Sequence, residues 1–439
     1  MNIKIKKIGL YILLIVVLIT YFFVRLPELR YSFDRGITAP TDFMQDYIAA
    51  KQVLAGKSVY PYDFMAIFKS ILSRNGIKLD QSKFSVFVNA HPPFMSILLL
   101  PLGLLSFRNA IFLWSIVTIC SMLLIIFILI KTEGIPLLYL PLISICVFAW
   151  TPFQTNLYYG QVSILITLFV ITGWYFLKKG KEEMSGIFIA LATMLKFYPG
   201  LLIVYFIINK RYKAFFYSII GISLILVLTF VVNKHDFIYF YFNRILFDVN
   251  YHIPSISNLS IGEFFNNLFL SVKTYYNNGT FIVSVNPFYR NIFLYSSEAL
   301  LLLYLVVSIR KYDYNNELGF SIFIILSLIL SPICWDHYLT LLLLPLIVLI
   351  KKLIKKNTLY EMLIFLTALF LISIDTDSVY FHKVMDITHF FIPGNPMSFI
   401  YRMTFYSAQF YGMVLLLILN FRLIKQSHKS TSEPPANQS

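Results

Sequence analysis

Long apolar segments follow one another along almost the whole 439-residue chain, and they constrain its fold more than any other feature. A helix that crosses a bilayer needs about 20 mostly apolar residues, and shorter segments are possible when protein shields them. The candidate segments are 8–25, 92–106, 109–130, 135–150, 160–177, 184–208, 213–233, 292–309, 318–331, 338–350, 359–374 and 404–424. The pattern predicts an all-α, polytopic membrane protein.

Composition excludes the soluble alternative. Charged residues make up 13% of the chain and hydrophobic residues 58%, whereas soluble domains have about 25% and about 45–50%. The net charge of +15 does not indicate a nucleic-acid partner, because the cations gather at the ends of apolar segments. These clusters are Lys4, Lys6 and Lys7; Lys210, Arg211 and Lys213; Arg310 and Lys311; Lys351, Lys352, Lys355 and Lys356; and Arg422, Lys425 and Lys429. Such clusters mark cytoplasmic loops.

The charge distribution predicts a topology with both termini in the cytoplasm. The long polar interruptions 26–91, 234–291 and 375–403 then all lie on the extracytoplasmic side. The first apolar run follows a basic N-terminal stretch, and no small-residue cleavage site follows the run. This pattern predicts a signal anchor that is retained. We expect residues 1–425 to form a single transmembrane domain and residues 426–439 a disordered cytoplasmic tail.

One cluster, Lys178 to Lys181, opposes simple alternation, because it would then be extracytoplasmic. An alternative resolves this conflict. Segment 135–150 is short enough to be re-entrant, and Pro199 predicts a break of segment 184–208 near Lys196. We favour the alternative because it brings Gln161 and Lys196 to the same side as the other polar motifs.

Two carboxylates open the first long polar loop. Ala49, Ala50, Val53 and Leu54 recur at helical spacing, which predicts an amphipathic interfacial helix from about residue 41 to 54. Asp42 and Asp46 share one face of it. Asp42 is either the N-cap of this helix or a general base held at the membrane surface.

Further polar residues stand at the ends of apolar segments. His91 precedes Pro92 and Pro93, and Tyr159 and Gln161 stand at the mouth of an apolar helix. Trp335, Asp336 and His337 form a dense polar group before Leu339. Lys196 lies inside an apolar segment, where a charge is costly and by default functional, although snorkelling to the surface is the alternative. His91 and Trp335 also have a simpler interpretation as interfacial residues.

Together these motifs resemble glycosyltransferase family 87, a mannosyltransferase-like branch of the GT-C membrane fold. The resemblance covers roughly residues 40–350. The matching stretches are DFMQDYIAAKQVLAGKSVY (42–60), PPFMSILLLPLGLLS (92–106), YYGQVSILI (158–166), SGIFIALATMLKFYPGLLIVYFIINKRYKA (185–214), NLS (258–260) and SPICWDHYLTLLLLP (331–345).

The resemblance implies a bundle of about 10–12 transmembrane helices in the plasma membrane, with short interfacial helices in its extracytoplasmic loops. It implies transfer of a hexose, with mannose the first candidate, from a polyprenyl-phosphate donor to a lipid-linked or glycan acceptor. The transfer is inverting, takes place on the extracytoplasmic face and requires no metal or other cofactor. By similarity Asp42 is the base, and Lys196 and His337 meet the donor phosphate. The remaining expected substrate-binding residues are His91, Gln161, Asp46, Trp335, Asp336 and Tyr159.

A transporter or flippase for lipid-linked sugars, or a polymerase-type glycan protein, is the rival interpretation. A transporter is expected to have internal repeats with broken helices at matching positions in two halves. The sequence has no visible repeat, and its charges stand at helix mouths. A purely structural membrane protein is a third interpretation, and the charge of Lys196 within an apolar segment opposes it.

Overall fold

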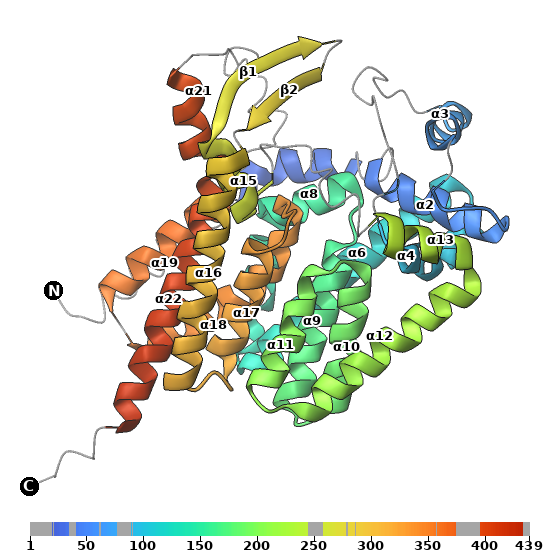
Figure 1. Cartoon of the computed structure of the whole chain (residues 1–439). Helices are drawn as coiled ribbons and strands as arrows, with labels where there is room; N and C mark the ends of the chain where they lie inside the picture. The colour runs from blue at the N-terminus through green and yellow to red at the C-terminus, as the bar shows by residue number, and fades with distance from the viewer. Residues whose placement is uncertain are drawn as a thin grey trace, which may run out of the picture. The chain divides into compact units, whose positions relative to one another are not determined.

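The computed structural model of the chain describes residues 20, 22–34, 41–60, 63–76, 89, 91–244, 258–277, 280–285, 287–356, 358–374 and 396–432 (Figure 1). Residues 22–34 are helical. The helices that follow are α2 (Thr41–Leu54), α3 (Phe64–Arg74), α4 (Pro93–Leu98), α5 (Leu100–Gly103), α6 (Phe107–Glu133), α7 (Leu140–Ala149), α8 (Thr151–Tyr159), α9 (Ser163–Lys178), α10 (Glu182–Leu195), α11 (Leu201–Ile208), α12 (Tyr212–Val232) and α13 (Lys234–Ile238). The later elements are α15 (Ile261–Leu268), β1 (Leu270–Asn277), β2 (Thr280–Val285), α16 (Pro287–Lys311), α17 (Glu317–Ile329), α18 (Leu343–Lys356), α19 (Leu359–Ile372), α21 (Pro396–Tyr401) and α22 (Ala408–Ser432).

The all-α, polytopic fold class is confirmed. Five helical segments in the described part of the chain are long and apolar enough to cross a membrane: Phe107–Glu133, Tyr212–Val232, Phe288–Lys311, Asp336–Lys356 and Ala408–His428. Shorter apolar helices are Ser163–Lys178, Tyr198–Ile208, Glu317–Ile329 and Leu359–Ile372. The larger count of about 10–12 crossings stays a prediction. The candidate segment 8–25 lies mostly outside the described residues.

The region between α6 and α11 contains both irregularities that the sequence predicted. Helices Leu137–Ala149 and Thr151–Tyr159 meet at a bend of 62°, which fits a broken span or a re-entrant loop. Helix α10 ends at Leu195, and Lys196 has an extended backbone with φ −150° and ψ 142°. The break near Lys196 is therefore confirmed, because a proline three residues later prevents a continuous helix.

Two other predicted segments differ from the structure. Segment 92–106 does not form one spanning helix, because it divides into α4 and α5, which have six and four residues. Pro101 lies at the start of α5, where it interrupts the hydrogen-bond ladder of a continuous helix. Helix α22 continues to Ser432, so the tail that the sequence placed from residue 426 is helical over its first seven residues.

Helix α2 forms where the sequence predicts it, but its environment differs from the prediction. Every residue from 43 to 50 is buried, with Asp46 only 1% exposed. The expected exposed polar face is therefore absent from this stretch and begins only at Lys51. Tyr47 donates a hydrogen bond of 2.9 Å to the backbone oxygen of Leu105, which fixes α2 within the protein.

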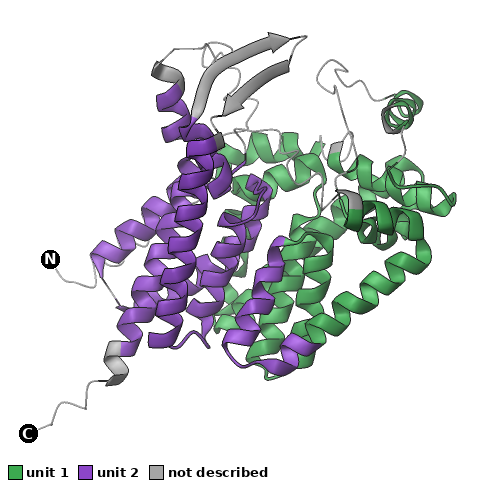
Figure 2. Ribbon diagram, in the orientation of Figure 1, with its two compact units in different colours: residues 1–197, 217–249 green, residues 198–216, 250–439 purple. Residues whose placement is uncertain are grey.

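The chain divides into two compact units, which Figure 2 colours separately. Unit 1 contains residues 1–197 and 217–249, and unit 2 contains residues 198–216 and 250–439. In unit 1, α9 packs against α6 and α10, and α2 packs against α4, α5 and α8. Unit 1 buries charged groups among its apolar side chains: Asp46, Glu133, Lys196 and Asp236 are each at most 8% exposed.

Unit 2 is built around α17, which is buried from Leu318 to Ile329 and contacts α11, α18 and α22. Helices α19 and α22 approach closely, because a Cβ atom at Gly412 would lie 2.5 Å from Cγ2 of Ile372. Strands β1 and β2 form an antiparallel hairpin that the sequence did not predict, within the loop 234–291. Residues 375–395 of the third predicted loop lie outside the described residues.

Candidate active site

Three predicted site residues of unit 1 form one chain of hydrogen bonds. The side-chain amide of Gln161 donates through Nε2 to Oδ2 of Asp42. Nζ of Lys196 donates to Oε1 of the same amide at 3.0 Å. The three residues are far apart in sequence, and one amide therefore links a carboxylate to an ammonium group.

The turn between α8 and α9 positions Gln161. Gly160 ends α8 in the left-handed conformation, with φ 66°, which strongly favours glycine. Nε1 of Trp114 donates to the backbone oxygen of Gly160 at 2.8 Å, and the Trp114 ring stacks on Phe43 of α2 at 5.7 Å. Trp114 therefore fixes the turn that carries Gln161 and packs against the helix that carries Asp42.

The break after α10 positions Lys196. Its side chain is directed into the protein and is only 8% exposed. A buried ammonium group requires hydrogen-bond acceptors or a counter-charge, because its desolvation is costly. Its bond to Gln161 places Lys196 among the candidate site residues, and the snorkelling alternative does not describe this side chain.

Asp46 and His91 form a second pair beside this chain. Nδ1 of His91 lies 2.6 Å from Oδ1 of Asp46, and both side chains are buried. The backbone of His91 is held by the side chain of Asn89, whose oxygen accepts from the His91 N–H at 3.1 Å, and by the hydroxyl of Tyr60. The sequence predicted both residues as site residues but did not predict their pairing.

The environments of Asp42 and Asp46 differ, although one helical turn separates them. Asp42 is the second residue of α2 and is partly exposed. Asp42 lies in the first turn of α2, where a carboxylate is favourable, and both interpretations of Asp42 stay predictions. Asp46 is enclosed with His91. Asp42 is therefore the more accessible of the two carboxylates. We call Asp42, Asp46, His91, Gln161 and Lys196 the unit 1 cluster.

A second group of predicted residues lies in unit 2. Asp336 and His337 begin a short 3-10 helix and are both buried. Oδ1 of Asp336 accepts from the backbone N–H of His337 at 2.7 Å and lies 3.5 Å from Nδ1 of the imidazole ring. Trp335 precedes them with an extended backbone and is half-buried. The carboxylate of Asp336 therefore restrains His337 through the backbone and lies next to its ring.

Asn258 holds the loop that carries these residues. Its Oδ1 accepts from the backbone N–H of Cys334 at 2.8 Å, and its Nδ2 donates to the backbone oxygen of Pro332 at 3.1 Å. The backbone N–H of Leu259 also donates to the oxygen of Cys334. The NLS motif (258–260) therefore clamps the segment before Trp335. The sequence quoted this motif but assigned it no role.

The structure adds Tyr198, which sequence reasoning missed. Its ring stacks on Tyr338 at 4.9 Å, and Tyr338 lies edge-on to His337 at the same distance. Tyr198 is 8% exposed, and among the described residues no group makes a hydrogen bond to its hydroxyl. We call Tyr198, Asn258, Trp335, Asp336, His337 and Tyr338 the unit 2 cluster.

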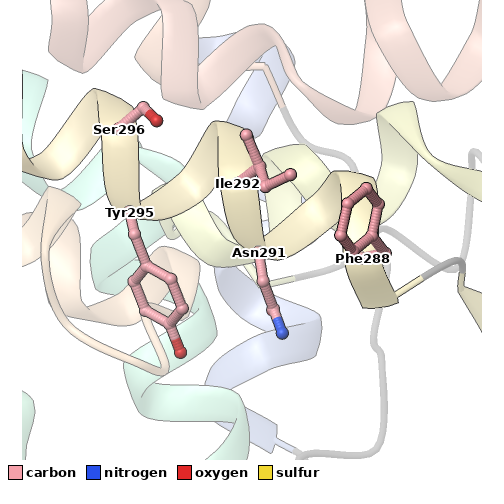
Figure 3. Close-up of a pocket in the computed structure, with 5 residues that line it drawn as sticks. All are labelled: Phe288, Asn291, Ile292, Tyr295 and Ser296. Atoms are coloured by element: carbon pink, nitrogen blue, oxygen red, sulfur yellow. The ribbon is translucent and has the colours of Figure 1, made fainter.

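Tyr159 is half-buried and lies edge-on to Tyr158 at 4.8 Å. Along α16, the side chains of Phe288, Asn291, Ile292, Tyr295 and Ser296 line an open hollow that contains none of the predicted site residues (Figure 3). Within the described ranges, no group of three or more His, Cys, Asp or Glu residues is placed to hold a metal ion.

Comparison with known families decides what kind of protein carries this site. The model of glycosyltransferase family 87 matches residues 89–332, which is more than half of the chain. The chain belongs to glycosyltransferase family 87. It is therefore a membrane glycosyltransferase. No curated protein matches it.

The family match covers only part of the candidate residues. It includes His91, Tyr159, Gln161 and Lys196, whereas Asp42 and Asp46 precede it and Trp335 to His337 follow it. The hydrogen bond of Gln161 to Asp42 therefore connects a residue within the matched region to one outside it. This contact carries the argument for Asp42 independently of the family match.

Proposed function

We propose that this glycosyltransferase moves a hexose, with mannose the first candidate, from a polyprenyl-phosphate donor to a lipid-linked or glycan acceptor with inversion. The observation that carries the proposal is the hydrogen-bond chain from Lys196 through Gln161 to Asp42. It links an accessible carboxylate to a buried cation within a membrane glycosyltransferase, and the reaction requires both groups.

The carboxylate serves the acceptor. An acceptor hydroxyl attacks the anomeric carbon and forms a new C–O bond while its proton passes to Asp42. The bond between the anomeric carbon and the phosphate oxygen breaks, and its electron pair stays on the lipid phosphate. Attack from the side opposite the phosphate inverts the anomeric centre.

The cation serves the leaving group. Negative charge grows on the lipid monophosphate as its bond to the sugar breaks, and a preorganised ammonium group stabilises that charge. Lys196 is the buried cation of the unit 1 cluster, and its bond of 3.0 Å to Gln161 sets the position of its Nζ. We propose that Lys196 meets the phosphate and that Gln161 keeps it at a fixed distance from Asp42. His337 keeps its predicted role in donor binding.

The test supplies membranes containing the protein with radiolabelled polyprenyl-phosphate mannose. We expect label in a new lipid-linked or glycan product, with the opposite anomeric configuration to the donor. Membranes with Asp42→Asn are the matched control. Transfer of the intact labelled donor across the membrane, without a new glycosidic bond, would instead support the transporter interpretation.

We also propose that the site faces the extracytoplasmic side. The basic clusters at the ends of apolar segments support this orientation. Single cysteines at Asn75 and Lys355, in a background with Cys120, Cys146 and Cys334 replaced by serine, test it in intact cells. We expect an impermeant thiol reagent to label position 75 and not position 355. The reverse pattern would overturn the orientation.

A further inference from the structure

The ends of several helices bring basic side chains together at one end of unit 2. These are the C-terminal ends of α16, α18 and α22 and the N-terminal ends of α17 and α19 (Figure 1). The basic residues are Arg310, Lys311, Lys351, Lys352, Lys355, Lys356, Arg422 and Lys425. The carboxylates in the same segments are Asp313, Glu317 and Glu361. We call this region the basic end of unit 2.

Glu361 is the centre of this region. It is only 2% exposed, and its Oε1 accepts from Nζ of Lys356 at 2.9 Å and from Nε of Arg422 at 3.2 Å. Nε2 of Gln426 donates to the same oxygen at 3.2 Å. The guanidinium of Arg422 also lies 4.9 Å from the centre of the exposed Tyr360 ring. One buried carboxylate thus holds two cations from two helices.

Ring contacts show that the C-terminal end of α16 lies beside the C-terminal part of α22. Tyr304 lies edge-on to Phe421 at 4.9 Å, and Tyr312 lies edge-on to His428 at 5.6 Å. Tyr304 and Phe421 lie within α16 and α22, at least one turn before the helices end. Tyr312 directly follows α16, and His428 lies in the polar last turns of α22. The basic side chains of α16, α18 and α22 therefore share one end of unit 2.

The carboxylates do not neutralise this end. Glu361 carries one negative charge and binds two cations, and Glu317 pairs with Lys352 at 2.9 Å. Lys355 and Lys425 are exposed, and among the described residues no carboxylate forms an ion pair with either. The surplus of positive charge therefore lies on side chains that are open to the surroundings.

The corresponding basic group of unit 1 is nearly balanced. Lys131, Lys178, Lys179 and Lys181 there share the end of α6 and the turn between α9 and α10 with Glu133, Glu182 and Glu183. Lys178 pairs with the buried Glu133 at 3.1 Å. A general requirement for cations at helix ends explains both groups, but it does not explain the larger surplus in unit 2.

We propose that the basic end of unit 2 binds the phosphate of anionic phospholipids in the leaflet that it faces. The apolar exteriors of α16 and α19 place it at the depth of the lipid headgroups, where Tyr360 is also suited to lie. Juxtamembrane Lys and Arg side chains attract anionic headgroups in proportion to their number. Glu361 prearranges two cations, and Lys355 and Lys425 supply the surplus charge.

The test is native mass spectrometry of the full chain in neutral detergent, titrated with phosphatidylglycerol or phosphatidylcholine. We expect retained phosphatidylglycerol and little phosphatidylcholine. In the double variant Lys355→Gln/Lys425→Gln, affinity for phosphatidylglycerol should fall about tenfold or more. The matched control, Lys179→Gln/Lys181→Gln, removes the same charge from unit 1 and should bind as the wild type does.

Several outcomes would overturn the proposal. They are equal retention of both lipids, equal loss of affinity in the two double variants, or displacement of phosphatidylglycerol by equimolar inorganic phosphate. The last result would identify a site for free phosphate. Sugar transfer in phosphatidylcholine membranes should be the same in wild type and Lys355→Gln/Lys425→Gln, which shows that the variant is folded and separates this proposal from the proposed function.

Discussion

The unit 1 cluster and the unit 2 cluster are held in place by different kinds of contact. In unit 1, side chains bond to side chains: Gln161 joins Asp42 to Lys196, and His91 joins Asp46. In unit 2, Asn258 and Asp336 bond mainly to the backbone of the segment 332–337. Substitutions in unit 1 should therefore change charge and proton transfer, whereas substitutions of Asn258 should change the position of a loop.

Substitution of Asp42 should cause the largest loss of turnover. Asp42→Asn keeps the shape of the side chain but removes the proton acceptor, so turnover should fall about 10²–10⁴-fold while donor binding persists. Asp46→Asn should cost less turnover, because Asp46 is enclosed with His91. Turnover with labelled donor and donor binding are measured for both variants. The reversed order would make Asp46 the base and would assign Asp42 a structural role.

Substitution of Lys196 should cause the second-largest loss of turnover. Lys196→Met removes the cation from the chain of hydrogen bonds, and loss of one preorganised donor of this kind costs about 10²–10³-fold in turnover. Lys196→Arg should retain part of the activity, because the charge remains but its geometry changes. Turnover of both variants is compared after gel filtration has shown that each is folded. Wild-type turnover in Lys196→Met would exclude a role in the reaction.

In unit 2, substitutions of His337 and Asn258 should separate a role in donor binding from a role in positioning the loop. His337→Ala should raise the donor concentration for half-saturation about 10- to 100-fold and leave acceptor saturation unchanged, because it removes one polar group. Asn258→Ala should lower the free energy of unfolding by about 1–3 kcal/mol, because it removes the hydrogen bonds to Pro332 and Cys334 and takes a partner from the backbone N–H of the buried Cys334. Saturation curves and thermal unfolding measure both variants. An unchanged donor curve in His337→Ala would refute its role in donor binding.

Substitution of Tyr198 should cause the smallest loss of turnover, and it distinguishes a hydroxyl that binds substrate from a ring that only packs. Tyr198→Phe removes only the buried hydroxyl, for which the described residues supply no partner. If this hydroxyl bonds to a substrate, turnover at low donor concentration should fall about 2- to 10-fold while the thermal unfolding temperature stays the same or rises. The matched control is Tyr338→Phe, in the ring that stacks on it. Unchanged transfer with raised stability would make Tyr198 a packing residue only.

Features with a local physical cause were predictable from the sequence. The apolar segments predicted the polytopic helical fold, and Pro199 predicted the break that exposes the Lys196 position to other polar groups. Interruption of segment 92–106 was missed, although Pro93 and Pro101 stand in it. Prolines are compatible with a first helical turn, and the sequence does not show whether one helix or two begin there.

Pairings between distant residues were not predictable from one sequence. Asp46 and His91 are 45 residues apart, and Asn258 bonds to groups 74 and 76 residues away. Their residue types indicated polar sites, but the partner of each is chosen by tertiary packing. The burial of α2 was missed for the same reason. Its pattern of polar and apolar residues does not reveal that the protein encloses Asp46 and Gln45.

Gln161 stands between two opposite charges, and an amide has a donor end and an acceptor end. Its nitrogen faces the carboxylate of Asp42 and its oxygen faces the ammonium of Lys196, so the reverse orientation would place like against like at both ends. The amide therefore connects the two oppositely charged groups in a set order. The cluster is therefore a fixed electric dipole inside the membrane protein. A donor whose phosphate is negative and whose anomeric carbon becomes positive would lie along this dipole in one direction only. On the proposed function, Gln161 thus selects the polarity of the bound donor before any bond breaks.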